Sequence, residues 1–141
     1  MTTPVRFAYA HPDARRAEGS LLAYLPLTLR HNTHVLTVPG LLDTGSTVNV
    51  LPYSLGLQLG FVWEQQSTRV HLTGSLARLP ACGVIVSGQV ASFPPVERAF
   101  AWTQATDVPM LLGQVNFCME FDVCFFRSQA AFAINPKGTA R

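Results

Sequence analysis

The sequence predicts a single all-β domain, and three observations support this fold class. Apolar residues make up 48% of the 141 residues and charged residues only 13%, which is typical of a chain that folds around an apolar core. Short runs of aliphatic, β-branched and aromatic residues are separated by Gly, Pro, Asn and Ser, as in strands joined by turns. The length suits one domain. We expect this domain to span residues 21–135, with 1–20 as an N-terminal extension or interface strand and 136–141 as a tail.

The first part of the chain is expected to supply an edge strand and a strand pair. Residues 5–10 are the candidate edge strand, which a His-Pro pair ends. Residues 21–30 and 35–38 can pair around the sequence His-Asn-Thr at 31–33, because Asn favours turns. They lead into an apolar run from residue 40 that turns at residues 43–45.

The centre of the chain should contain a hairpin after a short strand. Residues 48–51 read as a strand that a proline ends, and residues 53–60 as a short irregular or helical link. Residues 68–79 alternate in a way that predicts a hairpin with its tip at 73–75. The glycine of this tip can adopt the positive φ that such turns often need.

The last part of the chain is expected to be β-rich with one short helix. One or two helical turns should follow Gly113, where apolar and polar residues mix. The expected strands are a pair over 84–86 and 89–93, single strands over 99–103 and 108–112, and a closing strand over 125–134.

Composition argues against several classes of partner. The net charge of +2 supports neither a nucleic acid nor an anionic membrane as partner. No apolar run has the length of a membrane helix or a signal peptide, so a cytoplasmic, soluble protein is expected. The three cysteines are expected to be reduced core thiols. The four histidines and the cysteines lack metal-ligand spacing, so we expect no metal and no cofactor.

The run Leu41-Leu42-Asp43-Thr44-Gly45-Ser46 is the best candidate for chemistry. A carboxylate directly after a buried apolar run is costly unless it is paired or hydrogen-bonded. Gly45 lets the backbone turn sharply, and Thr44 and Ser46 supply hydroxyls that can bond the backbone or the carboxylate. By itself the run also fits an ordinary β-turn in which Asp43 caps its own loop.

The order of motifs resembles the retropepsin family of aspartic peptidases. That family has two apolar residues, then Asp-Thr/Ser-Gly-Ala/Ser and an apolar strand, a flap hairpin, and later two apolar residues with a glycine that leads into a short helix. This chain offers the run 41–46, the strand 48–51, the hairpin around Gly74, and Leu111-Leu112-Gly113. The resemblance covers about residues 20–134 and implies a closed, orthogonally packed β-barrel lobe with a flap and one short C-terminal helix.

The resemblance implies a peptide hydrolase built from two identical chains. Hydrolysis by this route needs two carboxylates that share a proton, one acting as base towards water and the other polarising the scissile carbonyl. The chain has a single Asp-Thr-Gly turn, and a two-fold homodimer would supply the second Asp43. Thr44 would bond across the axis, and Gly45 would offer its backbone to the peptide.

The resemblance also assigns supporting roles around the catalytic turn. Leu111, Leu112 and Gly113 would form the structural loop behind the site. The residues expected to contact the substrate or to form the flap are Thr47, Leu72, Thr73, Gly74 and Ser75. Apolar side chains should line the groove, so cleavage between apolar residues is expected. A Ser46 hydroxyl that donates to the ionised pair would stabilise its charged form, and we therefore expect an acidic pH optimum.

Two positions depart from the viral pattern. Viral members have an acid two residues after the motif glycine and an arginine after the later glycine; here Thr47 and Gln114 stand there. These changes leave room for a catalytically weak binding or dimerisation module of the same fold. A third interpretation is an unrelated small β-barrel whose Asp-Thr-Gly sequence is only a turn.

Overall fold

The computed structural model describes residues 4–11 and 21–137. The expected extension 1–20 and tail 136–141 are therefore described only in part, because residues 1–3, 12–20 and 138–141 lie outside the described residues. No helix in the described ranges is long and apolar enough to cross a membrane.

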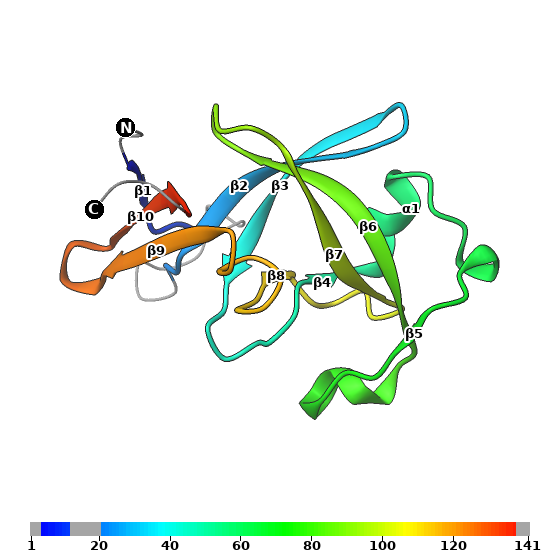
Figure 1. The fold of residues 1–141 in the computed structure, drawn as a ribbon. Helices are drawn as coiled ribbons and strands as arrows, with labels where there is room; N and C mark the ends of the chain where they lie inside the picture. The colour runs from blue at the N-terminus through cyan, green and yellow to red at the C-terminus, as the bar shows by residue number, and fades with distance from the viewer. Residues whose placement is uncertain (1–3, 12–20, 138–141) are drawn as a thin grey trace.

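Six strands close into a barrel, as the sequence predicted (Figure 1). Around the ring, each strand bonds the next, and β6 pairs back onto β2. A short seventh strand, β5 (Arg69–Val70), extends the sheet beside β6. The six strands in ring order are β2 (Tyr24–His31), β3 (His34–Leu42), β8 (Met110–Leu112), β4 (Val50–Leu51), β7 (Val96–Thr103) and β6 (Ala81–Val90).

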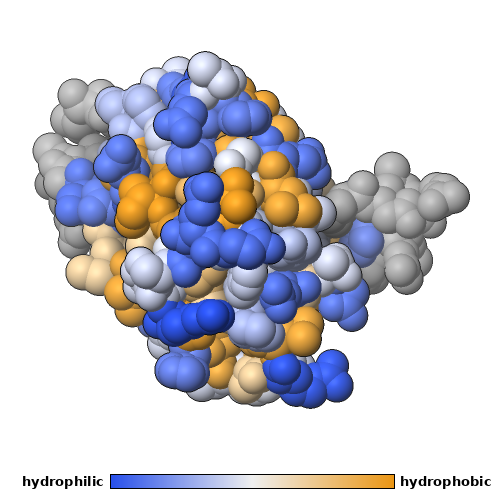
Figure 2. All heavy atoms as spheres, turned by 90° about the vertical axis from the view of Figure 1, so that its right-hand side faces the viewer, coloured by the Kyte–Doolittle hydropathy of each residue, from blue (hydrophilic) through white to orange (hydrophobic). Residues whose placement is uncertain are grey.

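The period-two pattern of the sequence explains which side chains enter the barrel. Along β2, Leu25, Leu27 and Leu29 are buried while their neighbours are more exposed, because successive strand residues point to opposite faces. Trp102 and Phe100 on β7 complete the same core. The abundant apolar residues also leave apolar surface between hydrophilic residues on the face that carries α1 (Figure 2).

A second, three-stranded sheet lies beside the barrel (Figure 1). It has the order β1 (Val5–Ala8), β10 (Ala131–Pro136), β9 (Phe121–Phe126). The single closing strand expected over 125–134 is therefore wrong. A 3-10 turn, Arg127–Gln129, and Ala130 at φ 48° reverse the chain, and this lets β9 and β10 pair as a hairpin.

The strand pair expected over 84–86 and 89–93 is also wrong, because β6 runs straight through Ser87 and Gly88. Gly88 pairs with Leu29 of β2 and lies beside the Leu27 side chain. The chain reverses only after Val90, where Ala91 takes φ 47°. Gly88 thus serves barrel closure and not a turn.

The hairpin expected over 68–79 has a different register and a longer connection. β5 pairs with the start of β6, Arg69 with Cys82 and Val70 with Ala81. Its expected second strand, 76–79, instead lies mostly in a 3-10 helix, Gly74–Arg78. Gly74 does take a positive φ of 66°, as the turn chemistry predicted.

The α-helix of the described chain is α1 (Tyr53–Gln58), in the segment expected to be an irregular or helical link. After Gly113 the chain coils as expected, but in hydrogen-bonded turns: the amides of Phe117 and Cys118 both donate to Gly113 O, at 3.0 and 3.2 Å. Phe117 and Phe121 stack at 4.9 Å between ring centroids and pin this segment to the core. The short helix of the fold is thus α1, and residues 114–120 form turns.

Replacing Gly56 of α1 by alanine should destabilise the fold. A Cβ there would lie 2.1 Å from Trp102 Nε1, and Trp102 is fully buried. Overpacking of this kind costs about 1–3 kcal/mol, to be measured by urea denaturation. Ser54→Ala, at an exposed position of the same helix, is the matched control and should stay within about 0.5 kcal/mol of the wild type. Equal midpoints for the two variants would contradict the packing described.

Candidate active site

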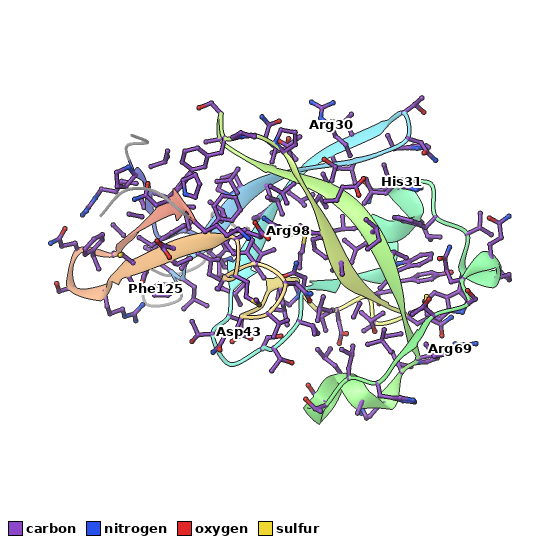
Figure 3. The ribbon with its side chains drawn as sticks, viewed as in Figure 1. Arg30, His31, Asp43, Arg69, Arg98 and Phe125 are labelled. Carbon is purple, nitrogen blue, oxygen red and sulfur yellow. The ribbon has the colours of Figure 1, made fainter. Side chains whose placement is uncertain are left out.

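Asp43 is held at the end of a parallel strand pair. β3 and β8 align Leu41 with Leu111 and Leu42 with Leu112. The Asp43 amide then donates to Leu112 O at 3.1 Å, which continues the ladder by one bond. The carboxylate consequently begins the loop between β3 and β4, at the periphery of the barrel (Figure 3).

The turn after Asp43 is stabilised by its own carboxylate. The Gly45 amide donates to Asp43 Oδ1 at 3.0 Å, and the Ser46 amide donates to Asp43 O at 3.1 Å. A Cβ at position 45 would lie 3.3 Å from Asp43 Oδ1, so glycine leaves room beside the carboxylate. Thr44 and Gly45 are exposed, and Asp43 is half-buried.

The Ser46 hydroxyl does not reach the carboxylate. It donates to Val48 O at 2.7 Å, so the sequence argument that gave it a role in stabilising the charged dyad is not supported. The donor that does meet the carboxylate is the Gly45 amide. Ser46 instead closes the loop towards β4.

The segment after β8 lies against the catalytic turn. The amides of Gln114 and Val115 donate to Ser46 O at 2.9 Å and Thr47 O at 2.8 Å. The Gln114 side-chain amide donates to Thr44 O. The structure therefore brings together the expected turn, 43–46, and the expected loop behind it, 111–113.

A groove lies between the Asp43 turn and residues 70–76. It is a cavity of about 150 Å³. Of the expected flap residues, Leu72 and Thr73 line it and Gly74 and Ser75 do not; Ser75 faces a separate hollow. Thr47 lines the groove as expected. The other lining residues are Gly45, Ser46, Val48, Val50, Val70, His71 and Leu76.

A larger cavity of about 470 Å³ shares the lining residues Val48 and Val70 with this groove. Its wall is mainly apolar and includes Phe61, Val84 and Ile85. Sequence reasoning missed these residues, since they come from β6 and from the loop after α1. Their apolar character was visible in the sequence, but only the barrel brings them beside the turn.

Asn49 is a further residue that sequence reasoning missed. It is fully buried, and its side chain bonds Gly113 N at 2.9 Å and Ala99 O at 3.3 Å. A signal existed: a polar residue within the run Val48-Asn49-Val50-Leu51, where apolar residues otherwise enter a buried strand.

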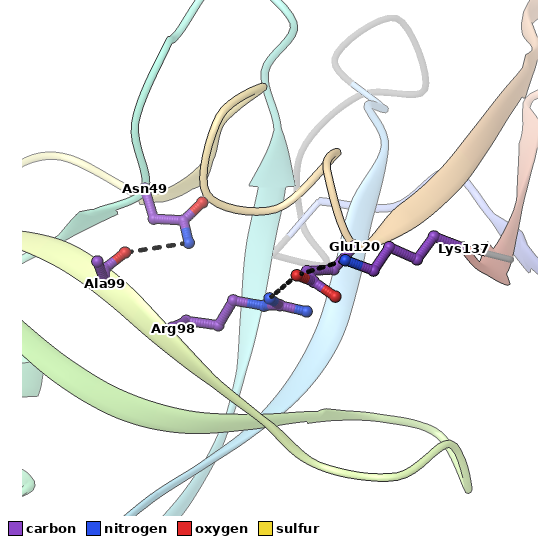
Figure 4. Close-up of polar contacts among 5 residues, drawn as sticks. All are labelled: Asn49, Arg98, Ala99, Glu120 and Lys137. Atoms are coloured by element: carbon purple, nitrogen blue, oxygen red, sulfur yellow. Dashed lines mark hydrogen bonds and ion pairs between the residues drawn. The ribbon is translucent and has the colours of Figure 1, made fainter.

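An ion pair between buried Arg98 and partly exposed Glu120 lies at the far end of the 114–120 turns (Figure 4). Arg98 on β7 lies 3.9 Å from Glu120, which also bonds Lys137 Nζ at 3.1 Å. Burial lowers the pKa of Arg98, and the charge of Glu120 opposes this shift. The guanidinium also lies over the Phe121 ring at 5.4 Å. These contacts fix where the turns end and β9 begins.

The described residues contain no group of three or more His, Cys, Asp and Glu side chains placed to hold a metal ion. The cysteines are free thiols, and Cys82 is buried as expected. Cys124 is exposed on β9, so the prediction that it belongs to the core is wrong. Its place in a three-residue exposed stretch at the end of an edge strand explains this.

Comparison with known proteins identifies the fold. No family model matches the sequence, and no curated protein matches it. The structure is similar to the crystal structure of a retropepsin-like aspartic protease from Rickettsia conorii, with a TM-score of 0.60 and 16% sequence identity; the match covers 96% of this chain and 97% of that one. At this identity the likeness shows a shared retropepsin-like fold.

The thiol of Cys118, in the turns behind the site, should react slowly. Burial raises its pKa and that of Cys82, so the reactive thiolate forms only at higher pH. Iodoacetamide at about pH 7.5 should therefore modify exposed Cys124 first, then Cys118, and Cys82 last, as followed by mass spectrometry of peptides. The rate at Cys118 should rise as the pH is raised. Modification of Cys118 as fast as that of Cys124 would contradict the placement of the 114–120 turns.

Proposed function

We propose that this chain is an aspartic endopeptidase in which two identical copies each contribute Asp43. The observation that carries the proposal is the placement of the carboxylate. Asp43 begins a surface loop whose next residues, Gly45 to Val48, line a groove together with the flap residues Leu72 and Thr73. A peptide in this groove would pass beside the turn, and each chain supplies one Asp-Thr-Gly carboxylate.

The chemistry needs the second carboxylate at hydrogen-bond distance from the first. An ionised Asp43 takes a proton from water, and the water oxygen attacks the scissile carbonyl carbon while the protonated Asp43 of the other copy donates to the carbonyl oxygen. Collapse of the tetrahedral intermediate breaks the C–N bond, and a carboxyl group protonates the leaving nitrogen. Because one of the pair must keep a proton, an acidic pH optimum is expected.

Several exposed apolar side chains support a two-fold dimer around the turn. Val115, 51% exposed, belongs to the segment that bonds the catalytic turn, and Met119, 65% exposed, follows it. On the second sheet, β9 is an outer strand with Phe125 and Phe126 exposed. An outer strand with apolar neighbours is a suitable site for a second copy. In a two-fold dimer, each copy could bury Val115 and Met119 on the turns, and Phe125 and Phe126 on β9, against its partner.

The two cavities support a preference for apolar residues in the peptide. The small groove is lined by Val48, Val50 and Leu72, and the larger cavity beside it by further aliphatic and aromatic side chains. Such walls favour aliphatic or aromatic side chains, because apolar surface leaves water.

The second candidate is a binding or dimerisation module of the same fold that cleaves little. Thr47 and Gln114 favour it, because both are neutral where viral members carry an acid and an arginine. In this chain Gln114 meets Thr44 O, a backbone group. This contact can hold the turn but offers a peptide no charge.

Asp43→Asn should abolish cleavage of denatured casein between about pH 3 and pH 7, a loss of at least roughly a thousandfold, because a general acid and base are removed. The asparagine keeps an oxygen for the Gly45 amide, so the fold should persist. Asp107→Asn, at an exposed acid outside the groove, is the matched control and should retain activity. A folded, dimeric wild type that cleaves nothing at any pH would favour the binding module.

Mixing wild type with Asp43→Asn tests the shared dyad. If each active centre needs both copies, an equal mixture with free exchange should show about half the activity per wild-type chain, because half of the wild-type chains pair with a variant. Activity per chain should also rise with protein concentration through the dimerisation range. Unchanged activity in the mixture would contradict a dyad formed between chains.

A further inference from the structure

The side chain of Asn49 lies at the centre of the contacts between the catalytic loop and the barrel. Its accessible surface is zero. The Nδ2 group donates to Ala99 O of β7 at 3.3 Å (Figure 4), and Oδ1 accepts from Gly113 N at 2.9 Å. The Asn49 backbone is bonded as well: its amide donates to Asn116 Oδ1 at 3.0 Å, and its carbonyl accepts from Ala101 N at 2.8 Å.

One peptide group connects Asn49 with Asp43. The Leu112 carbonyl accepts the Asp43 amide at 3.1 Å, and the Gly113 amide donates to Asn49 Oδ1. That carbonyl and that amide belong to the same planar peptide bond, which rotates as a unit. The orientation that Asn49 imposes on Gly113 N–H is therefore also the orientation of the oxygen that holds the Asp43 backbone.

The Leu112–Gly113 peptide group is packed tightly against the backbone of Val48. A Cβ at position 113 would lie 2.4 Å from Val48 O and 2.6 Å from Val48 C, so the two backbones cross in near contact. A side chain at position 113 does not fit beside Val48. The buried Gly113 amide depends on the Asn49 oxygen, because a buried amide without an acceptor is costly.

Asparagine suits this position because its uncharged side chain has an oxygen that accepts a hydrogen bond and an NH2 group that donates one. A leucine has the same branching but no hydrogen-bonding group, so it would leave Gly113 N–H and Ala99 O without their present partners. An ionised aspartate could accept from Gly113 but would face Ala99 O with a second acceptor and no donor. A protonated aspartic acid, with one O–H and one carbonyl oxygen, can reproduce both bonds.

We propose that Asn49 is a positioning residue for the active centre and sets the orientation of the Asp43 backbone through the Leu112–Gly113 peptide group. The effect on activity rests on the proposed function, whereas the effect on Asp43 and Gly45 geometry does not. A simple role in core stability would lower the melting temperature without displacing the catalytic turn.

The test compares Asn49→Asp with Asn49→Leu. In Asn49→Asp, burial raises the pKa of the new carboxyl group, so it is neutral in acid and the two hydrogen bonds re-form. As the pH rises through that pKa, the bonds are lost. The expected result is near-wild-type kcat in acid and a fall of at least about tenfold towards neutral pH relative to the wild type, with KM little changed, because the catalytic group is misplaced and the groove is not. Asn49→Leu should show the loss at every pH.

Amide NMR resonances supply a readout that does not need activity. The Gly45 amide donates to Asp43 Oδ1, so its chemical shift reports the geometry of the catalytic turn. The Gly45 amide resonance of Asn49→Leu should differ from that of the wild type at every pH. The resonance of Asn49→Asp should differ from it only at the higher pH. Thr103→Val is the matched control: Thr103 is fully buried and accepts from Ala105 N at 3.1 Å, so its loss should lower stability and leave Gly45 unmoved.

The proposal is overturned if the Asp43 and Gly45 resonances of Asn49→Asp keep wild-type positions across the whole pH range. It is also overturned if Thr103→Val moves them as far as Asn49→Leu does. If the leucine variant does not fold, the test uses Asn49→Asp alone and compares its spectra in acid and at neutral pH. A wild type without peptidase activity would refute the proposed function, and the NMR comparison would still decide the role of Asn49.

Discussion

The near contact between the backbones of Val48 and Gly113 is the constraint on which the site depends. Residue 113 must be glycine, since a Cβ would lie 2.4 Å from Val48 O. This approach allows the strand that ends at Leu112 to bond Asp43 on one side while the loop after Asp43 returns to form β4 on the other. Without it, β4 could not lie between β8 and β7, and the barrel could not close around the same core.

The contacts that hold the catalytic turn involve backbone groups and neutral side chains. Asp43 meets the amides of Gly45 and Ser46 through its carboxylate and carbonyl. Around it, Gln114, Asn49 and Asn116 act as neutral amides. Viral retropepsins have an acid and an arginine near these positions. Apart from the bond from the Gly45 amide to the Asp43 carboxylate, these hydrogen bonds join neutral groups, and they therefore do not depend on the protonation of a side chain.

The cavities and the exposed apolar residues have separate consequences for function. The groove at the turn is small, about 150 Å³, and the adjoining cavity is about three times larger at about 470 Å³. In the proposed peptidase, a peptide side chain bound in the larger cavity would contribute binding energy away from the Asp43 turn. The exposed residues of β9 and of the 114–120 turns lie outside both cavities and remain available to a second copy.

The sequence by itself determined the fold class, the strand pair of β2 and β3 with its turn, and the position of the Asp43 turn. Each follows from local rules: period-two burial, turn residues, and the steric freedom of glycine. Local rules failed where a long-range partner decided the conformation. Ser87-Gly88 looks like a turn but pairs with β2, residues 76–79 look like a strand but lack a strand partner, and Ser46 bonds Val48 rather than the carboxylate. Only the tertiary structure could place Asn49 against the Leu112–Gly113 peptide group, because its two side-chain partners, Ala99 and Gly113, lie 50 and 64 residues away along the chain.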